Sequence, residues 1–369
     1  MKNTIGNNVT FTLFGESHGS LIGATIDGLP SGIKIDEDFI ENQMSKRRAK
    51  GLISTLRQEE DIPNIVSGVF NGYTTGTPLT IIIKNKDTRS KDYSKIKDVP
   101  RPGHADYSAK IKYYSYQDYR GGGHFSGRLT AAIVAIGAIC TLALKEKDIH
   151  IATHIKKLYK FEDDEFDKDN IMKQFEILNN KDFAVLNEKI EKKMKEEIDN
   201  ARLNLDSLGG ILETVVLNLP AGLGDPLFNS VEGMISKALF GIGAIKGVEF
   251  GEGFNFANLK GSNANDEFRV VDNKVVTTTN RNGGINGGIT NGMPLVIKSV
   301  VKPTSSIAQS QNSINMESME NTTLEITGRH DPAIIHRARV VVDSMIAIVL
   351  MDLLVTRYGQ DWSKILCED

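Results

Sequence analysis

Residues 118–128, DYRGGGHFSGR, place three consecutive glycines among side chains that could do chemistry. Two guanidinium groups, an imidazole and a hydroxyl lie in this stretch, contributed by Arg120, Arg128, His124 and Ser126. A glycine-rich turn before a helix leaves backbone N–H groups that favour an anion. Histidine titrates near neutral pH, so an imidazole beside a phosphate can serve as a general acid. The stretch therefore indicates a site for a small anionic molecule.

Arginine and histidine gather in the same few segments of the chain. Of 44 basic residues, 14 are arginines, and nine of these lie in 47–57, 101–128 and 329–339. Most of the seven histidines lie in or beside these segments. A guanidinium fork grips phosphate or carboxylate with two hydrogen bonds, which lysine cannot do. The clustering favours a site for a small polyanion over the alternative of scattered surface ion pairs.

The composition excludes several classes of protein. The chain has 369 residues, 40% of them apolar, and a net charge of −3, which argues against nucleic-acid binding by general electrostatic attraction. Its two cysteines, Cys140 and Cys367, form no CxxC pair, which argues against a disulfide framework or a metal site. The apolar run 130–144 is shorter than the about 20 residues of a membrane span, and 340–355 contains two aspartates. Because the N-terminus lacks an apolar signal core, we expect a cytoplasmic protein without a membrane segment.

The pattern of apolar residues predicts the elements that would position these side chains. Strands are expected around the loop GESHG and in NIVSGVF, PLTIIIKN, GGILETVVLNLPAGLG and MPLVIKSVVKP. Helices are expected over 36–48, just beyond the glycines and over 336–357, and the charged segment 155–203 suggests a surface helix without chemistry. Residues 259–292 and TSSIAQSQNSIN suggest loops. Because no linker or repeat divides the chain, we expect one α+β domain over 1–369.

Familiar catalytic motifs are few in this sequence. It contains no P-loop, no HExxH and no GxGxxG after a strand, which removes the usual support for ATPase, zinc-peptidase and Rossmann functions. GESHG fits the G-x-S-x-G pattern of serine hydrolases, with Ser17 as nucleophile. That elbow needs a strand, a turn and a helix, whereas LIGATIDGLPSG indicates a strand and a turn. A serine hydrolase is the weakest of the alternatives.

Three segments resemble the signatures of the chorismate synthase family: GESHGSLIGATIDGLPSG, GHFSGRLTAAIVAIGAI and GRHDPAIIHRA. The pieces between them also resemble the family in order, from about residue 4 to 355. The resemblance implies a layered β-α-β sandwich, in which antiparallel sheets enclose helices, assembled as a homotetramer. It implies a lyase that removes phosphate and a C6 hydrogen from 5-enolpyruvylshikimate 3-phosphate by 1,4-anti elimination. The product is chorismate, at the last step of the shikimate pathway, and reduced FMN is required.

The resemblance also implies roles for individual residues. The side chains that would hold the substrate are Arg47, Arg48, Arg128 and Arg337, with Ser17 and Ser126 hydrogen-bonding nearby. His18 would protonate or stabilise the reduced flavin, and His104 would protonate the leaving phosphate. Asp331 would act with flavin N5 in removing the C6 proton.

The flavin site implied by the resemblance is assembled from several loops. Its residues are His124, Phe125, Ser126, Gly243, Ala244, Gly287, Lys302, Pro303, Thr304, Ser305, Ser306 and Arg329. The family commonly has RGGGRSSAR where this chain has RGGGHFSGR, and Leu52 stands near a position that is often arginine. Some members reduce flavin with NADPH. Without an extra nucleotide-binding domain, we expect an external flavin reductase, with NADPH as an indirect reductant.

The altered GHFSG leaves one further alternative. The chain could be a flavin- or phosphate-binding homologue of the same fold whose activity is changed or lost.

Overall fold

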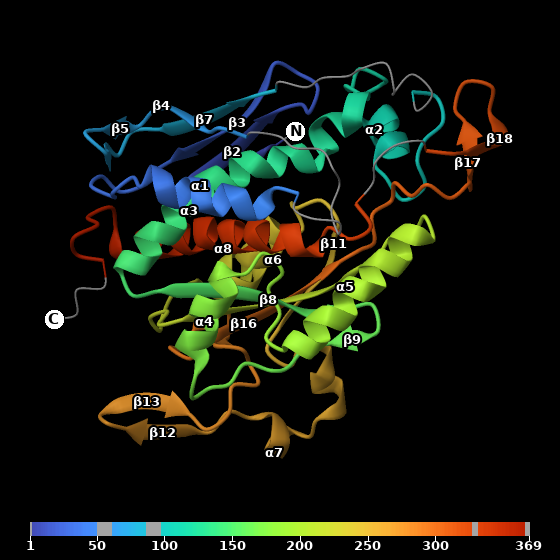
Figure 1. Ribbon diagram of the computed structural model, residues 1–369. Coiled ribbons are helices and arrows are strands. Elements are labelled where there is room, and N and C mark those ends of the chain that lie inside the picture. The colour runs from blue at the N-terminus through green and yellow to red at the C-terminus, as the bar shows by residue number, and fades with distance from the viewer. Residues whose placement is uncertain (1, 50–60, 86–96, 327–330, 366–369) are drawn as a thin grey trace.

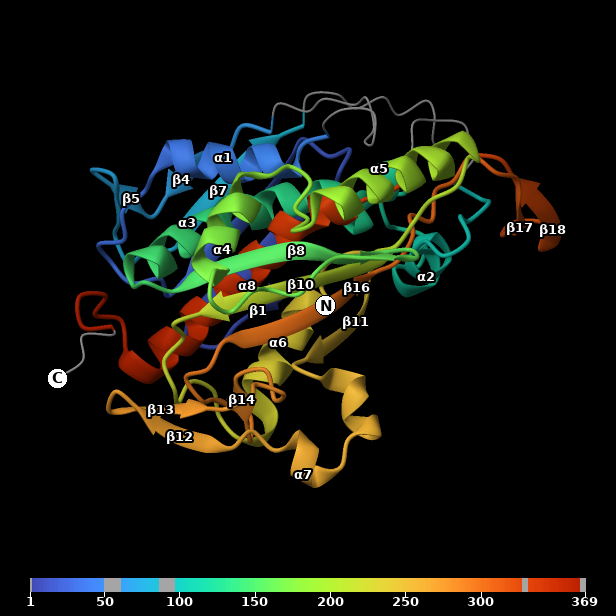
Figure 2. The ribbon, with the colours of Figure 1, turned by 60° about the horizontal axis from the view of Figure 1, so that its bottom comes forward.

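Two five-stranded antiparallel sheets enclose a layer of helices in the computed structural model, which describes residues 2–49, 61–85, 97–326 and 331–365 (Figures 1 and 2). The first sheet has the order β1 (Thr4–Ile5), β2 (Thr10–Gly15), β3 (Leu21–Asp27), β7 (Leu79–Lys84), β4 (Asn64–Ser67). The second has the order β11 (Ile245–Phe250), β16 (Leu295–Val301), β10 (Gly210–Leu217), β8 (His150–Leu158), β9 (Phe161–Glu162). This arrangement confirms the predicted α+β sandwich.

The helical layer is built on α1 (Glu37–Arg47), α3 (Thr130–Glu146) and α8 (Ile335–Tyr358). Asp36 caps α1 by accepting a hydrogen bond from the backbone N–H of Phe39, while acidic residues begin the helix and basic ones end it. Helices α3 and α8 cross closely at Gly137, where an added Cβ would lie 2.2 Å from the Cβ of Ser344. Both helices are buried along most of their length, as predicted.

Burial, rather than length, explains the apolar composition of α3. Together with the turn before it, the helical segment Gly127–Glu146 is long and apolar enough to cross a membrane by length and composition alone. The run 130–144 alone is shorter than a membrane span, as predicted, and the added length comes from the preceding 3-10 turn and the last two residues of α3. However, 78% of its apolar stretch is buried inside the fold, where the two sheets and α8 cover it.

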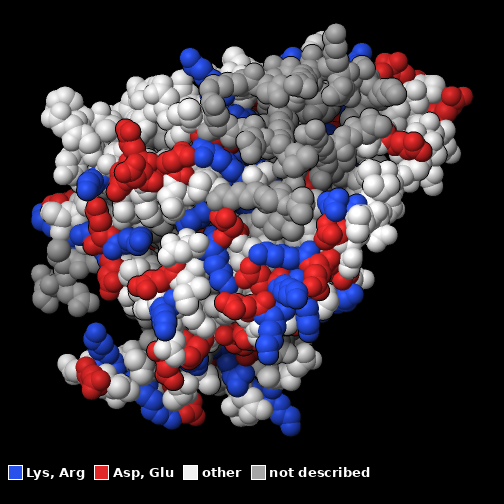
Figure 3. All heavy atoms as spheres, viewed as in Figure 1, with Lys and Arg blue, Asp and Glu red and all other residues white. Residues whose placement is uncertain are grey.

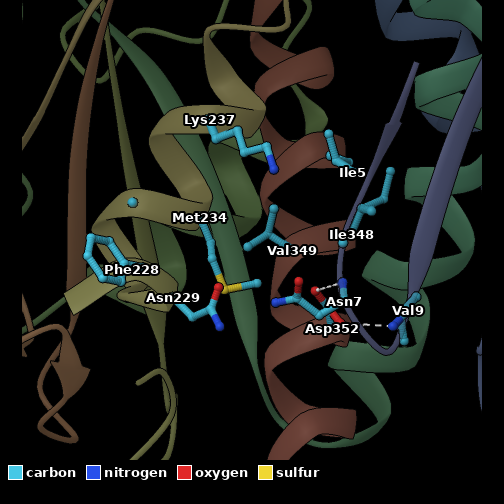
Figure 4. A pocket seen from close by; sticks show the side chains of 12 residues that line it. Ile5, Asn7, Val9, Phe228, Asn229, Met234, Lys237, Ile348, Val349 and Asp352 are labelled. Carbon is cyan, nitrogen blue, oxygen red and sulfur yellow. Dashed lines mark hydrogen bonds between the residues drawn. The ribbon is translucent and has the colours of Figure 1, made fainter. Parts of the chain in front are cut away.

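Asp352 of α8 binds the turn at residues 7–9 to the helical layer. Its carboxylate accepts three backbone N–H hydrogen bonds of 2.8 Å, from Asn7, Asn8 and Val9. Figure 4 shows this contact at the edge of a small pocket between the turn and helices α6 (Val231–Leu239) and α8. A buried carboxylate is tolerated in an apolar helix here because backbone donors satisfy it.

Several segments expected to be loops contain short hairpins. They are β12 (Phe268–Val271) with β13 (Lys274–Thr277), β14 (Ile285–Asn286) with β15 (Ile289–Thr290), and β17 (Gln311–Asn315) with β18 (Glu320–Leu324). The prediction was wrong at these places because polar turn residues outweighed the short apolar runs. Asp272 and Asn273 both have positive φ, as the tight turn between β12 and β13 requires.

The charged segment 155–203 divides into a buried part and an exposed part. The predicted surface helix is α5 (Glu188–Leu203), and Figure 3 shows basic and acidic side chains interspersed over this face. Before α4 (Ile171–Asn180), however, the segment begins in the buried strand β8. The residues of β8 alternate between the face that packs on α8 and the face that packs on α4, so its polar side chains lie inside the fold.

His154 is a fully buried polar side chain of β8, as is its neighbour Thr153. Its Nδ1 donates to Asp163 Oδ2 at 2.7 Å, and its Nε2 donates to Glu213 Oε1 at 3.2 Å. Because carboxylates only accept, both ring nitrogens must carry hydrogen. Burial disfavours the charged ring, but the hydrogen bonds to the two carboxylates outweigh it and raise the pKa of His154 above its ordinary value.

This cluster predicts a pH-dependent stability. The raised pKa stabilises the fold at low pH, so the free energy of unfolding should fall as pH rises from about 6.5 through the folded-state pKa of His154. His154→Ala should abolish this fall and cost about 3–5 kcal/mol near pH 6, because two buried carboxylates lose their partner. Urea denaturation across neutral pH measures both effects. The control is His150→Ala, whose ring also pairs with an aspartate at 2.7 Å, but with an exposed one. An equal loss at every pH would contradict this account.

Candidate active site

The three glycines form a turn that two histidines contact. The turn comprises two 3-10 segments, Arg120–Phe125 and Gly127–Leu129, which lead into α3. Gly121, Gly122 and Gly123 all have positive φ, a conformation that other residues rarely adopt. An added Cβ at Gly121 would lie 2.2 Å from Cε1 of His18, and one at Gly122 would lie 3.4 Å from Cε1 of His104. The turn therefore brings the two predicted catalytic imidazoles into one site.

Ser17 binds the loop between β2 and β3 to this turn. Its hydroxyl donates to the carbonyl oxygens of Arg120 and Gly121 at 3.1 and 3.3 Å, and its backbone N–H donates to Gly123 at 3.2 Å. Its Oγ also lies 3.0 Å from Nδ1 of His18, and both side chains are buried. Because Ser17 lies between two antiparallel strands and not before a helix, it lacks the context of a hydrolase nucleophile.

His104 is held by a hydrogen bond within its own segment. Its Nδ1 lies 2.7 Å from Oδ1 of Asp106, the first residue of helix α2 (Asp106–Lys112). Arg101 grips the same carboxylate with Nε and Nη2, both at 2.7 Å. Burial would raise the pKa of Asp106, but the hydrogen bonds from Arg101 and His104 hold it well below its ordinary value. The carboxylate is therefore ionised at neutral pH.

The segment 302–306 lies against the His104 loop. Lys302 Nζ and Ser305 Oγ both donate to the carbonyl oxygen of Gly103. The backbone N–H of Lys302 donates to Ala244 at 2.9 Å, which adds the turn at 243–244 to the same region. Thr304 Oγ1 is buried and has no hydrogen-bond partner among the described residues. The predicted flavin segment 302–306 thus lies against the loop that carries His104, and the turn at 243–244 adjoins that segment at Lys302.

A buried carboxylate holds two of the predicted substrate arginines together. Asp61, whose side chain is 1% exposed, forms ion pairs with Arg47 at 2.7 Å and with Arg128. Arg128 Nε also donates to Asn85 Oδ1 at 3.0 Å. Arg337 Nε donates to the backbone oxygen of Arg47 at 2.7 Å. These contacts connect three predicted arginines to the end of the glycine turn.

The remaining predicted residues differ in how they relate to this cluster. Arg337 pairs with Asp331 at 2.7 Å, so the predicted base lies beside a predicted substrate ligand. Arg48 pairs instead with exposed Glu41, at 2.5 Å. Gly287 lies in the β14–β15 turn, whose next residue, Gly288, accepts a hydrogen bond from Val231. This contact places the turn at the start of α6, whereas residues 243–244 follow the end of that helix.

The altered GHFSG residues have contacts of their own. His124 Nδ1 lies 2.9 Å from the backbone oxygen of Gly15, and Phe125 packs edge-on against Tyr113 with 6.2 Å between ring centres. Ser126 Oγ accepts the backbone N–H of Arg128 at 3.3 Å and so caps the second 3-10 segment. Arg329 and Leu52 lie outside the described residues.

Sequence reasoning missed the carboxylates that support the site. Asp106 could have been found, because an aspartate two residues after a candidate acid histidine is within reach of its ring. No sequence pattern pointed to Asp61, because its partner Arg128 lies 67 residues away in the chain.

Comparisons with known proteins point to one family. A family model described as chorismate synthase matches residues 9–355. A chorismate synthase from Pyrococcus abyssi is 45% identical over 352 residues, covering 95% of this chain and 97% of that protein. One from Methanocaldococcus jannaschii is 44% identical over 369 residues, covering 96% and 97%. A crystal structure of chorismate synthase matches with a TM-score of 0.76 at 28% identity, covering 96% of this chain and 94% of the other.

The glycine turn yields a graded prediction. Gly121→Ala should displace the ring of His18 and lower stability by about 1–3 kcal/mol, since its Cβ would overlap the imidazole. Gly122→Ala also strains a backbone with positive φ, but it should displace the His104 ring less, because its Cβ meets that ring at an ordinary contact distance. NMR signals of the two rings and thermal unfolding measure these effects. Gly127→Ala is the matched control, since its Cβ meets nothing within 4 Å. Equal shifts of both rings in the two glycine variants would refute the geometry.

Proposed function

The chain belongs to the chorismate synthase family, and we propose that its glycine turn, its two histidines and its arginine cluster form one active site. Its function is that of the family: a lyase reaction that eliminates phosphate from 5-enolpyruvylshikimate 3-phosphate to give chorismate, in aromatic amino acid biosynthesis. Members of this family use reduced FMN. The observation that carries the site assignment is the contact of His18 and His104 with neighbouring glycines of one turn.

His104 is the proton donor to the leaving phosphate. Its Nε2 would lie 3.5 Å from a Cβ added at Gly122, so this nitrogen is the one near the turn, while Nδ1 is engaged by Asp106. Loss of phosphate builds negative charge on oxygen, which an acidic imidazole and fixed guanidinium groups stabilise. Arg101, at the same carboxylate, adds a cation to this part of the site.

The arginine cluster holds the anionic groups of the substrate, which has two carboxylates and a phosphate. Asp61 keeps Arg47 and Arg128 side by side and offsets the repulsion between their charges. Arg337 joins them through its hydrogen bond to the backbone of Arg47. Cations positioned before the substrate arrives need no reorganisation on binding. Arg48, although paired with Glu41, is assigned to the same function.

Asp331 would act with flavin N5, when reduced FMN is bound, in removing the C6 proton of the substrate. Its carboxylate lies beside Arg337, so a base and a substrate-binding group are adjacent. His18, buried against Gly121 and in contact with Ser17, would protonate or stabilise the reduced flavin. Ser126, which caps the turn, is close to Arg128 in the same segment.

The residues of the 302–306 segment fit a phosphorylated flavin. The buried hydroxyl of Thr304 has no partner among the described residues, and a ligand phosphate or carbonyl would satisfy it. Lys302, Pro303, Ser305 and Ser306 are near Thr304 in the chain, and Ala244 of the turn at 243–244 contacts the backbone of Lys302. His124, Phe125, Gly287 and Arg329 complete the proposed flavin set. When bound, reduced FMN supplies transient electron density to the allylic system, which no side chain can do.

The supply of reduced flavin and the assembly of the enzyme complete the proposal. An external reductase provides reduced FMN, with NADPH as the indirect electron source, and the chains form a cytoplasmic homotetramer.

The decisive experiment is anaerobic turnover with reduced FMN and 5-enolpyruvylshikimate 3-phosphate, measured by phosphate release and by chorismate absorbance. Binding of FMN and substrate without turnover would favour the homologue with lost activity.

His104→Ala should lower kcat by roughly 10²–10⁴-fold, the usual contribution of a general acid. FMN affinity, measured by fluorescence titration, should change little. His150→Ala is the control, because His150 lies on β8 and pairs with Asp148. Turnover at the wild-type rate would remove His104 from this role.

Arg128→Ala should raise the KM for the substrate by about 10–100-fold, since a hydrogen bond to a charged group contributes about 1.5–3 kcal/mol. It should also lower stability, because Asp61 keeps only Arg47 as its arginine partner among the described contacts. Steady-state kinetics and urea denaturation separate the two effects. Arg202→Ala, which removes an exposed pair on α5, is the matched control. An unchanged KM would show that Arg128 serves Asp61 alone.

A further inference from the structure

We infer that Asp106 is a positioning residue that selects which nitrogen of His104 delivers the proton. The inference rests on the proposed role of His104 as the general acid. The inference assigns a function to Asp106 and explains why Arg101 binds the same carboxylate. The proposed role of His104 requires neither.

The carboxylate of Asp106 receives four hydrogen bonds from two residues. Oδ1 accepts from Nδ1 of His104 and from Nη2 of Arg101, both at 2.7 Å. Oδ2 accepts from Nε of Arg101 at 2.7 Å and from the backbone N–H of Arg101 at 3.0 Å. The side chains of Arg101 and Asp106 are largely buried, 9% and 13% exposed. A carboxylate bound at both oxygens in this way cannot rotate, so its position toward the imidazole is fixed.

The direction of the hydrogen bond determines the tautomer of His104. An ionised carboxylate only accepts, so Nδ1 must carry the hydrogen in the neutral ring. Nη2 of Arg101 lies 3.0 Å from Nδ1, but an N–H donor cannot donate to a nitrogen that itself carries hydrogen. Both groups therefore donate to Asp106. Nε2 then becomes the nitrogen that gains and loses a proton, and it is the one that faces Gly122.

Arg101 gives the pair a second property. A lone carboxylate beside an imidazole would favour the charged ring and hold its proton. Here the guanidinium of Arg101 also binds the carboxylate, so Asp106 stays in position to orient the ring whether or not the ring is charged.

The segment that carries these residues is held from outside. Ser313 Oγ donates to the backbone oxygen of Pro100 at 2.6 Å, and the backbone N–H of Met316 donates to that of Asp98 at 2.8 Å. Both donors belong to the β17–β18 hairpin or its turn. The hairpin, which the sequence did not predict, therefore holds the backbone just before Arg101.

The test is Asp106→Asn. The amide keeps the shape but offers an N–H₂ group, and Arg101 retains the carbonyl oxygen, so His104 must accept at Nδ1 and carry its hydrogen on Nε2. We expect kcat to fall about 10²–10⁴-fold, with KM within about threefold of wild type, as for a buried aspartate that orients a catalytic histidine. Nitrogen NMR of the His104 ring should show the change from the Nδ1–H to the Nε2–H tautomer.

Two further variants separate the possible failures. Asp98→Asn makes the same change in the same segment, where Asp98 faces Lys110 at 3.8 Å, and should keep wild-type kcat and tautomer. If His104→Ala retains turnover, the general-acid role itself fails. If His104→Ala loses turnover while Asp106→Asn keeps both kcat and the tautomer, only the present inference is overturned. Should Asp106→Asn not fold, a wild-type neutral ring with hydrogen on Nε2 alone would overturn it, and one with hydrogen on Nδ1 would support it.

Discussion

The site depends on a stretch of backbone without side chains. Gly121 and Gly122 lie so close to His18 and His104 that a methyl group at the first would overlap an imidazole. Their positive φ angles reverse the chain over a few residues, so the loop after β2, the His104 loop and the start of α3 meet. A side chain at Gly121 would displace the ring of His18 from the turn, and one at Gly122 would lie in contact with the ring of His104. Glycine at position 121 is therefore a steric requirement of the site.

Carboxylates that bind arginine compensate for the concentration of positive charge. Asp61 serves Arg47 and Arg128, Asp106 serves Arg101, and each carboxylate is buried or nearly so. Burying these pairs costs solvation free energy, and replacing them with apolar residues would often stabilise a protein. Their retention is understandable if they hold guanidinium groups in place for a polyanion. Two buried carboxylates, Asp163 and Glu213, hold the ring of His154 in a similar way.

The sequence could predict the parts of the site that lie in contiguous motifs. In the glycine stretch, in GESHG and in the segment around His104, the residues that indicate the chemistry are neighbours in the sequence. The alternation and the helical spacing of apolar residues around these motifs predicted β2, β3, α1, α3 and α8. The partners of those motifs could not be predicted, because Asp61 and Asn85 reach Arg128 only through tertiary packing. The hairpins after residue 259 were missed for another reason. Their strands are short, and turn-forming residues dominate their composition.

The residues that depart from the family pattern bear on whether the site is intact. His124 binds the backbone of Gly15 at the end of β2, and Phe125 packs on Tyr113, so both substitutions have local partners in the fold. Neither disturbs the glycines before them or the cap formed by Ser126 after them. Since the turn positions His18, His104 and Arg128 through backbone geometry, it tolerates changed side chains at 124 and 125. The departure therefore changes the lining beside the turn, and it places the two new side chains against the strand before His18 and the end of the helix after His104.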